Sequence, residues 1–235
     1  MKVRVRFSKK GSMKFIGHLD VMRYFQKALR RAEIDVAYTE GFNPHMIMSF
    51  ASPLGIGLTS DAEYMDIELK TPISSREAID RINQAGTEEM PVTGFVCIPN
   101  GKANKAMTLV AAADYALRFR KGHEPEIDWK NGLSSFFNQE QIPVMKKTKR
   151  SEKEVDIRPM IYAWSLEDDI LFLKLSAGSV ANLKPELVMD TYLSAQNVSC
   201  DPFAYEINRC EIYADVGEDG SRCLKSLYDL GEEIL

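Results

Sequence analysis

The sequence has no hydrophobic run long enough to cross a bilayer. Its longest apolar runs, such as TLVAAA from Thr108, fall far short of the roughly 20 residues that a membrane-spanning helix needs. The first ten residues alternate charged with apolar side chains, which differs from the apolar core of a signal peptide. We therefore expect a cytoplasmic protein that has no contact with a membrane.

Cysteine is scarce, and familiar catalytic motifs are missing. The 235 residues include four cysteines, and no two of them form a Cys-x-x-Cys pair. This spacing argues against a disulfide framework or a zinc knuckle. The sequence also has no Gly-x-Ser-x-Gly elbow and no evident Cys/His couple. These absences favour a protein that is not an enzyme, and we expect no cofactor and no bound metal.

Positive charge is confined to two segments of an otherwise acidic chain. The net charge is -4, with 45% hydrophobic and 27% charged residues. Residues 1–60 carry ten Lys/Arg and four Asp/Glu, and residues 101–160 carry twelve and eight. Residues 161–235 carry only five Lys/Arg against fourteen Asp/Glu. Two basic segments of this kind fit either a surface for phosphate or an acidic partner, or two solvated faces without a binding role.

The first half of the chain has the periodicity of a β-α-β-β-α-β series. Residues 2–9 alternate apolar and polar side chains, which is the pattern of a half-buried strand. Residues 18–34 repeat apolar side chains every three or four positions and predict a helix. A second helix is expected to start after Ser74 or Ser75 and to end at Gly86. Strands are expected at 44–51, 62–70 and 91–99.

After a polar connector at residues 100–107, the same order of elements is expected again. The signals are a strand ending near Lys121, a short helix at 127–139, strands beyond residue 142 with an Asp-Asp turn, a helix with Pro185 in its first turn, and a closing strand at 206–215. The sequence thus predicts the α+β class, with two tandem ferredoxin-like (βαββαβ) domains and antiparallel sheets. The expected boundaries are 1–100, 108–215, and 216–235 for a C-terminal tail that forms a helix or a loop.

Unusual backbone is concentrated in the hairpin that follows the first helix. Gly41 permits a positive φ, and Pro44 favours an extended Asn43, which would hold Phe42 and His45 on a stiff bend. Stiff bends position side chains for binding. The alternative is a demanding hairpin that has no role in binding.

Two glycines follow in the same hairpin. Gly55 and Gly57 remove side chains where a backbone or a ligand can approach closely, and Ser60 adds a hydroxyl nearby. A strand and not a helix follows this Gly-x-Gly, so it is not a nucleotide-binding fingerprint. A β-bulge is the structural alternative to a ligand site.

The segment KFIGHLD places Lys14, His18 and Asp20 at the entrance of the first helix. If the hairpin carries His45 toward them, two histidines and a carboxylate could ligate a metal or perform acid–base chemistry. The alternatives are a helix-capping histidine with a dipole-stabilising Asp20, and contact with phosphate or a partner. We predict one cleft that contains His18, Asp20, Asn43 and His45 beside Gly55 and Gly57.

A basic stripe is expected on the first helix. Arg23, Lys27 and Arg30 are spaced four and three residues apart, and a second basic cluster runs through residues 146–150 to Lys153 and Arg158. Cations of this kind neutralise phosphates, and nearby aromatics such as Phe42 stack on bases, so RNA is a candidate ligand.

Two runs carry a family resemblance: MKFIGHLDVMRYFQKALRRAEIDVAYTEGFNPHMIMSFASPLGIGLTSDAEYMDIEL and, further on, VDIRPMI. They resemble the radical SAM-linked family, a bacterial domain of unknown function encoded beside, or fused to, B12-binding radical SAM proteins. The matching positions are Gly17, His18, Asp20, Arg23, Arg30, Gly41, Phe42, Asn43, Pro44, His45, Ser49, Pro53, Gly57, Ser60, Glu63, Tyr64, Asp156, Arg158 and Pro159. Met46 and Ile47 depart from the expected proline and basic residue.

The resemblance implies a radical SAM protein as a partner and no established reaction. The chain has no Cys-x3-Cys-x2-Cys motif, so we do not expect it to be a conventional radical SAM enzyme itself. The leading hypothesis is a non-catalytic accessory protein that binds RNA or a translation-related substrate. The alternatives are a small-molecule or metal-dependent enzyme that uses His18, Asp20 and His45, and a protein–protein scaffold. The candidate binding residues are Lys14, His18, Asp20, Arg23, Lys27, Arg30, Phe42, Asn43, His45, Gly55, Gly57, Ser60 and Arg158.

Overall fold

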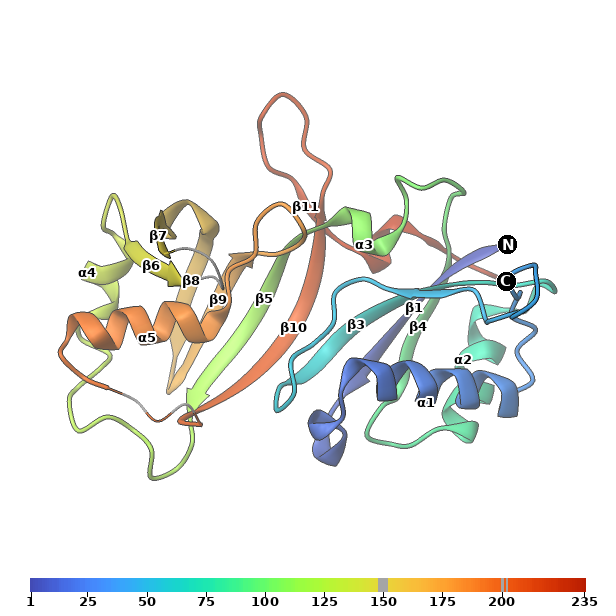
Figure 1. The fold of residues 1–235 in the computed structure, drawn as a ribbon, viewed down its shortest axis with the longest axis horizontal. Helices are drawn as coiled ribbons and strands as arrows, with labels where there is room; N and C mark the ends of the chain where they lie inside the picture. The colour runs from blue at the N-terminus through green and yellow to red at the C-terminus, as the bar shows by residue number, and fades with distance from the viewer. Residues whose placement is uncertain (148–151, 200, 202) are drawn as a thin grey trace. The chain divides into compact units, whose positions relative to one another are not determined.

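A computed structural model describes residues 1–147, 152–199, 201 and 203–235 (Figure 1). The chain divides into two compact units: unit 1 has residues 1–112 and 209–235, and unit 2 has residues 113–208. Unit 1 therefore takes in the C-terminal residues that the sequence assigned to a separate tail. The reason is strand pairing, because two short strands after residue 223 pair with strands of the unit 1 sheet.

Unit 1 contains an antiparallel sheet and two long helices (Figure 1). Its elements are β1 (Lys2–Lys9), η1 (Gly11–Phe15), α1 (His18–Arg31), β2 (Met48–Phe50), β3 (Thr59–Glu68), α2 (Ser75–Ala85), β4 (Val92–Cys97), α3 (Ala106–Leu109), β11 (Leu224–Ser226), η3 (Tyr228–Leu230) and β12 (Glu232–Glu233). The strand order is β12-β4-β1-β3-β10, where β10 (Tyr205–Asp215) belongs to unit 1 from Arg209 on, and β2 pairs with β3. β1 is antiparallel to both β3 and β4.

Helices α1 and α2 bury one face of this sheet. Phe25 and Leu29 of α1 and Ile82 of α2 pack with Val3 and Val5 of β1 in one apolar cluster. The N-cap of α2 is Ser74, whose hydroxyl accepts the backbone N–H of Glu77 at 3.3 Å, and Gly86 ends the helix as expected. The three- and four-residue apolar period thus predicts α1 and its buried face, and the capping residues predict the bounds of α2.

The other face of the unit 1 sheet is also covered. Figure 1 shows α1 and α2 on one side of β1, β3 and β4, and α3 with the C-terminal segment on the other side. Gly94 of β4 makes room for this cover, because a Cβ at this position would lie 2.4 Å from the ring of Tyr228. The alternation in residues 2–9 predicts a half-buried strand, but Arg4 is 0% exposed. β1 is buried on both faces because distant segments of the chain return to it.

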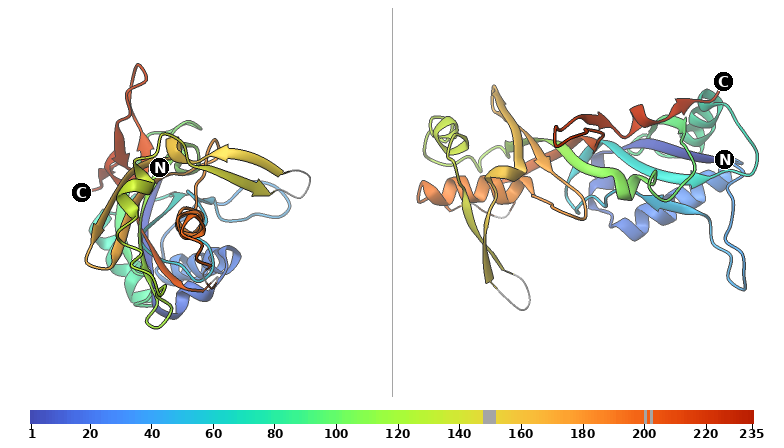
Figure 2. Two further views of the ribbon diagram at one scale, coloured as in Figure 1. Left: turned by 90° about the vertical axis from the view of Figure 1, so that its left-hand side faces the viewer. Right: turned by 90° about the horizontal axis from the view of Figure 1, so that it is seen from above.

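Unit 2 has a sheet, a long helix and a separate hairpin. Its elements are α4 (Leu133–Phe137), β6 (Pro143–Lys147), β7 (Glu152–Asp156), η2 (Arg158–Met160), β8 (Ile161–Glu167), β9 (Ile170–Ser176) and α5 (Pro185–Ala195), together with β5 (Val110–Phe119) from residue 113 on and β10 (Tyr205–Asp215) up to residue 208. The strand order is β10-β5-β9-β8, whereas β6 and β7 form a two-stranded sheet that projects from the unit (Figure 2). The helix expected at 127–139 is shorter, and Asp168 forms the expected turn with a φ of +53°.

The α+β class is confirmed. The described chain contains five α-helices, α1–α5, and a mostly antiparallel sheet. Within the described residues, no helix is both long enough and apolar enough to span a membrane.

Candidate functional site

A cavity of about 200 Å³ lies in unit 1, beside β2 and β3. It is lined by residues from β1, β2, β3, the hairpin that precedes β2 and the connector that follows β4. The lining residues are Lys2, Thr39, His45, Met46, Ile47, Met48, Ser49, Asp66, Ile67, Glu68, Ile98, Gly101, Asn104 and Lys105. This mixture of apolar and polar side chains is typical of a small-molecule site.

Strand register brings the polar side chains of the cavity to one face of the sheet. Lys2 of β1 lies opposite Glu68 of β3, and Ser49 of β2 lies opposite Asp66 of β3. Directly opposite residues share a face, and so do residues two apart in a strand. All four side chains therefore lie on the face opposite Val3, which packs in the cluster beneath α1 and α2.

Asp66 is already fully engaged by the protein. It accepts hydrogen bonds from Arg4 Nε at 2.8 Å and Arg4 Nη2 at 3.2 Å, and from the backbone N–H of Ala106 at 2.7 Å. Arg4 also donates to the carbonyls of Asn104 and Leu227. This buried ion pair holds the connector after β4 and the C-terminal segment against the sheet.

Other polar groups of the cavity have no such partners. In the part of the chain that the structure describes, no ion pair or side-chain hydrogen bond is recorded for Lys2, Ser49, Glu68 or Lys105. The side chains of Lys2, Ser49 and Glu68 are half-buried, and Lys105 is exposed. The cavity thus presents one carboxylate, one hydroxyl and two ammonium groups that are available to a ligand.

His45 is held at the rim of the cavity by Thr39. The backbone N–H of His45 donates to Thr39 Oγ1 at 3.1 Å, and the same oxygen lies 3.1 Å from His45 Nδ1. The carbonyl of Asn43 also lies 3.4 Å from Nδ1, so Nδ1 either accepts the Thr39 proton or donates its own proton to this carbonyl. Nε2 is a donor for a ligand in the first case and an acceptor in the second. Figure 2 shows the segment between α1 and β2 projecting beyond the sheet.

The entrance of α1 forms a separate group of predicted residues. Gly57, with a φ of +89°, donates its N–H to the carbonyl of Lys14 at 2.8 Å. The ring of His18 packs edge-on against Phe50, with 5.0 Å between the ring centroids. Asp20 lies in the first turn of α1, where its negative charge interacts favourably with the helix dipole. Its carboxylate also pairs with Arg23 at 3.1 Å.

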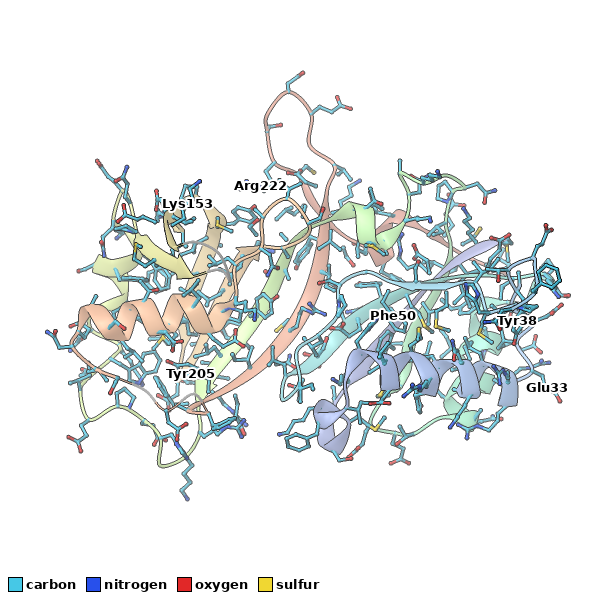
Figure 3. The ribbon with its side chains drawn as sticks, viewed as in Figure 1. Glu33, Tyr38, Phe50, Lys153, Tyr205 and Arg222 are labelled. Carbon is cyan, nitrogen blue, oxygen red and sulfur yellow. The ribbon has the colours of Figure 1, made fainter. Side chains whose placement is uncertain are left out.

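The structure does not bring the two histidines together. The cavity that His45 lines contains neither His18 nor Asp20. His18 contacts Phe50, the last residue of β2, whereas His45 precedes the first residue of that strand. Next to His45, Met46 forms an isolated β-bridge with Tyr38. Figure 3 shows Phe50 and Tyr38 well apart. The single cleft expected from the sequence is therefore divided between two places.

The remaining hairpin residues have local roles. Gly41 adopts the positive φ expected for it, +112°, and Phe42, Asn43 and Gly55 are exposed. Ser60 is buried, and its hydroxyl accepts the backbone N–H of Ala62 at 3.1 Å. Ser60 thus supports the start of β3 and does not line the cavity.

A second buried charge group lies near the start of β3. Glu63 and Arg209 form a bidentate pair, and Arg209 also donates to the carbonyl of Ser52 at 2.7 Å. Lys9 donates to the carbonyl of Ile16 at 3.0 Å and thereby fixes the segment that leads into α1. Burial lowers the pKa of Lys9, although the nearby Glu63 carboxylate opposes this shift.

The basic stripe predicted on α1 is exposed. Arg23, Lys27 and Arg30 all lie on the solvent side of the helix, while Val21, Phe25 and Leu29 are buried. Arg23 pairs with Asp20, whereas Lys27 and Arg30 have no ion pair among the described residues. Two cations of this stripe are therefore available to an anionic partner.

The second basic cluster is only partly described. Residues 148–150 lie outside the described residues. Arg158 donates to the carbonyl of Ile161 at 3.1 Å, and its backbone N–H donates to Asp156. Arg158 therefore shapes the turn between β7 and β8 in unit 2.

No group of three or more His, Cys, Asp or Glu side chains that could hold a metal ion occurs within the described residues. Among the described residues, Cys97, Cys210 and Cys223 do not form disulfides. The geometry thus offers binding groups and lacks a ready metal site in the part of the chain that is described.

Sequence reasoning missed most of the cavity. Lys2, Ser49, Glu68 and Lys105 were not among the predicted site residues, although Ser49 was among the positions that matched the family. A charged pair such as Lys2 and Glu68 on two predicted neighbouring strands was the available signal. It becomes informative only when the register of β1 and β3 is known.

Comparisons with known proteins give a family. A model of the family described as "Uncharacterized protein conserved in bacteria (DUF2344)" matches residues 2–185. No curated protein matches the chain. One similar solved structure is titled "Crystal Structure of a Cbf5-Nop10-Gar1 Complex", with 12% sequence identity and a TM-score of 0.43. The match covers 89% of this chain and 48% of that one, so this chain spans about half its length.

Proposed function

This chain belongs to the family of uncharacterized proteins conserved in bacteria (DUF2344), and we propose that it is a non-catalytic accessory protein that binds RNA or a translation-related substrate. The observation that carries the proposal is the exposed basic stripe on α1. Arg23, Lys27 and Arg30 follow one side of the helix, and two of them have no carboxylate partner among the described residues. Cations at helical spacing suit the regular negative charges of a nucleic-acid backbone.

Exposed aromatics add support for RNA. Phe42 is fully exposed at the tip of the hairpin, and Tyr38 at its base is also exposed. Tyr38 lies in the segment that follows the C-cap of α1, Ala32 (Figure 3). Aromatic rings near a basic helix end provide stacking surfaces for unpaired bases, and such stacking contributes about 1–3 kcal/mol per base.

The proposed partner is a radical SAM protein. This part of the proposal rests on the resemblance of residues 13–69 to the radical SAM-linked family. An accessory protein would bind the substrate and present it to the enzyme, which explains binding groups without an evident catalytic set. An affinity pulldown from native lysate, with and without ribonuclease, tests whether a radical SAM protein is retained directly or through RNA.

We further propose that each unit follows the ferredoxin-like plan. In unit 1, the order β4-β1-β3 with β2 on β3 supports this plan. In unit 2, the order β10-β5-β9-β8 supports it, with the β6–β7 hairpin as an insertion. Tandem domains of this kind offer two separate binding surfaces.

The RNA proposal is tested with a triple variant. Arg23, Lys27 and Arg30 are replaced by Ala, and binding of a labelled single-stranded RNA is measured by fluorescence anisotropy over a range of salt concentrations. Each lost phosphate contact should lower the slope of log K against log salt by about 0.7, with similar losses for different RNA sequences. The matched control replaces Lys70, Arg76 and Arg81, which are exposed elsewhere in unit 1, and removes the same charge.

Two results would count against RNA binding. One is an equal loss of affinity in both triple variants, which would indicate a general charge effect. The other is no measurable binding of total RNA by the unmodified protein at about 50 mM salt, where phosphate contacts are strongest. The scaffold hypothesis would then be favoured.

A further inference from the structure

Polar side chains that line the cavity beside β2 and β3 differ in whether other groups of the protein form hydrogen bonds with them. Arg4 and Asp66 bind each other and three backbone groups, so most of their hydrogen-bonding capacity is used within the protein. Ser49 and Glu68 lie on the same face without a recorded partner in the described residues. Both side chains are half-buried and line the same cavity as Lys2, so water satisfies them in the free protein and a ligand can replace that water.

The volume of the cavity limits the size of the ligand. About 200 Å³ is several times the roughly 30 Å³ occupied by a water molecule. It is smaller than the roughly 300–1,000 Å³ of pockets for drug-sized molecules. The cavity therefore has room for about one ring system, and the rest of a larger ligand would lie outside it.

The walls of the cavity suit a flat aromatic group with polar edges. Ile47 and Ile98 supply apolar surface to the cavity. The Glu68 carboxylate accepts hydrogen bonds, and the hydroxyl of Ser49 both donates and accepts them. Nucleobases combine apolar faces with edges that carry donors and acceptors.

Two lysines add positive charge to the same site. Lys2 and Lys105 line the cavity from β1 and from the connector after β4, and His45 lies at its rim. With Asp66 neutralised by Arg4, Glu68 is the one remaining anion of the lining. Free positive charge beside a ring-sized cavity suits a phosphate that is attached to the ring system.

We propose that this cavity binds a nucleotide, with the base between the apolar walls and the phosphate near Lys2 and Lys105. Guanine is the preferred base, because it presents two adjacent N–H donors that match the two oxygens of the Glu68 carboxylate. The nucleotide is either free or part of an RNA strand. This proposal goes beyond RNA binding by α1, because the polar side chains of the cavity and α1 lie on opposite faces of the sheet. The nucleotide site and the RNA-binding surface are therefore independent, and an experiment can disprove one without the other.

The experiment measures binding of GMP, AMP, guanosine and inorganic phosphate to the full chain by isothermal titration calorimetry. GMP should bind more tightly than AMP and than guanosine, and phosphate alone should bind weakly. The variant Glu68→Gln keeps the shape of the side chain and removes its charge, and it should weaken GMP binding roughly tenfold or more. Glu77→Gln, on the exposed surface of α2, is the matched control and should bind GMP normally.

A second variant separates recognition of the phosphate from recognition of the base. Lys105→Met should reduce the advantage of GMP over guanosine and leave guanosine binding nearly unchanged. Thermal unfolding of each variant confirms that it is folded. Binding of phosphate as tight as GMP would overturn the proposal, and so would equal binding of GMP by the Glu68→Gln variant or no binding of GMP and guanosine at millimolar concentration.

The source of the nucleotide is decided by competition. If the cavity takes a base from RNA, GMP should displace a labelled RNA that contains guanine, and Glu68→Gln should weaken that RNA more than one without guanine. If the cavity takes a free nucleotide, GMP should bind without displacing RNA. The triple variant on α1 should lose RNA and still bind GMP, so a failure of the proposed RNA function is distinguishable from a failure of this site.

Discussion

The two faces of the sheet in unit 1 are buried by different means. On one face, Val3 and Val5 pack against α1 and α2 in an apolar cluster. On the other face, Arg4 and Asp66 form a buried ion pair beneath α3 and the C-terminal segment. Apolar burial tolerates many arrangements, whereas a buried charge needs specific partners. The polar face therefore depends on contacts between residues that are far apart in the sequence.

The polar face itself contains a second contrast. Asp66 and Glu68 are two residues apart on β3 and share a face, yet the Asp66 carboxylate accepts three hydrogen bonds and the Glu68 carboxylate accepts none within the described residues. Position along one strand separates a structural carboxylate from one that is available to a ligand. The substitutions below test how far these contrasts hold.

The largest effect is expected for Arg4→Met. This variant keeps most of the side-chain volume but leaves the buried Asp66 without its cation, which should destabilise the protein by about 3–5 kcal/mol. Urea unfolding followed by circular dichroism measures the loss. The double variant Arg4→Met/Asp66→Leu should recover much of it, because no unpaired charge remains. A loss below about 1 kcal/mol for the single variant would show that the pair is not needed.

A smaller effect is expected for Gly94→Ala. The added Cβ would overlap the ring of Tyr228 at 2.4 Å, so the C-terminal segment must shift, at a cost of about 1–3 kcal/mol. Chemical unfolding gives the cost. In a Tyr228→Ala background the same substitution should cost much less, because the overlap is removed. An equal cost in both backgrounds would mean that this segment does not cover the polar face as described.

The smallest effect is a pH dependence at Lys9. Burial lowers the pKa of Lys9, so the native state loses this proton at a lower pH than the unfolded chain, where the pKa is about 10.4. The cost of burying the charge is fully present at neutral pH and is relieved as the pH rises from the lowered pKa toward 10.4. Unfolding at several pH values should show the unmodified protein gaining stability relative to Lys9→Met over this interval. A constant difference would indicate that Lys9 keeps its ordinary pKa.

Local signals in the sequence were sufficient for the helices of unit 1. Apolar spacing predicts α1 and its buried face, Ser74 and Gly86 mark the ends of α2, and Gly41 adopts its expected positive φ. The hairpin residues Asn43 and His45 lie on the same projecting segment, as expected. These features depend on residues within a few positions of one another, so local chemistry decides them.

Other expectations failed where distant segments meet. The C-terminal residues after 216 contain no free helix but add β11 and β12 to the sheet. His18 and His45 were expected to meet in one cleft, but His18 contacts the last residue of β2 and His45 precedes its first residue. The alternation of β1 was consistent with an exposed polar face, because nothing local revealed that Leu227 and Ala106 would cover Arg4 and Asp66.

By itself, the sequence determined the α+β class, the order of elements from β1 to β4, the exposed basic stripe of α1 and the positive φ of Gly41 before Phe42. Each of these follows from side-chain periodicity and backbone preference over short distances. Only the tertiary structure decided that Lys2, Ser49, Glu68 and Lys105 surround one cavity, and that Arg4 is buried. Both outcomes depend on strand register and on the return of the C-terminal segment, because pairing between strands is fixed by the sum of many weak contacts across the whole sheet.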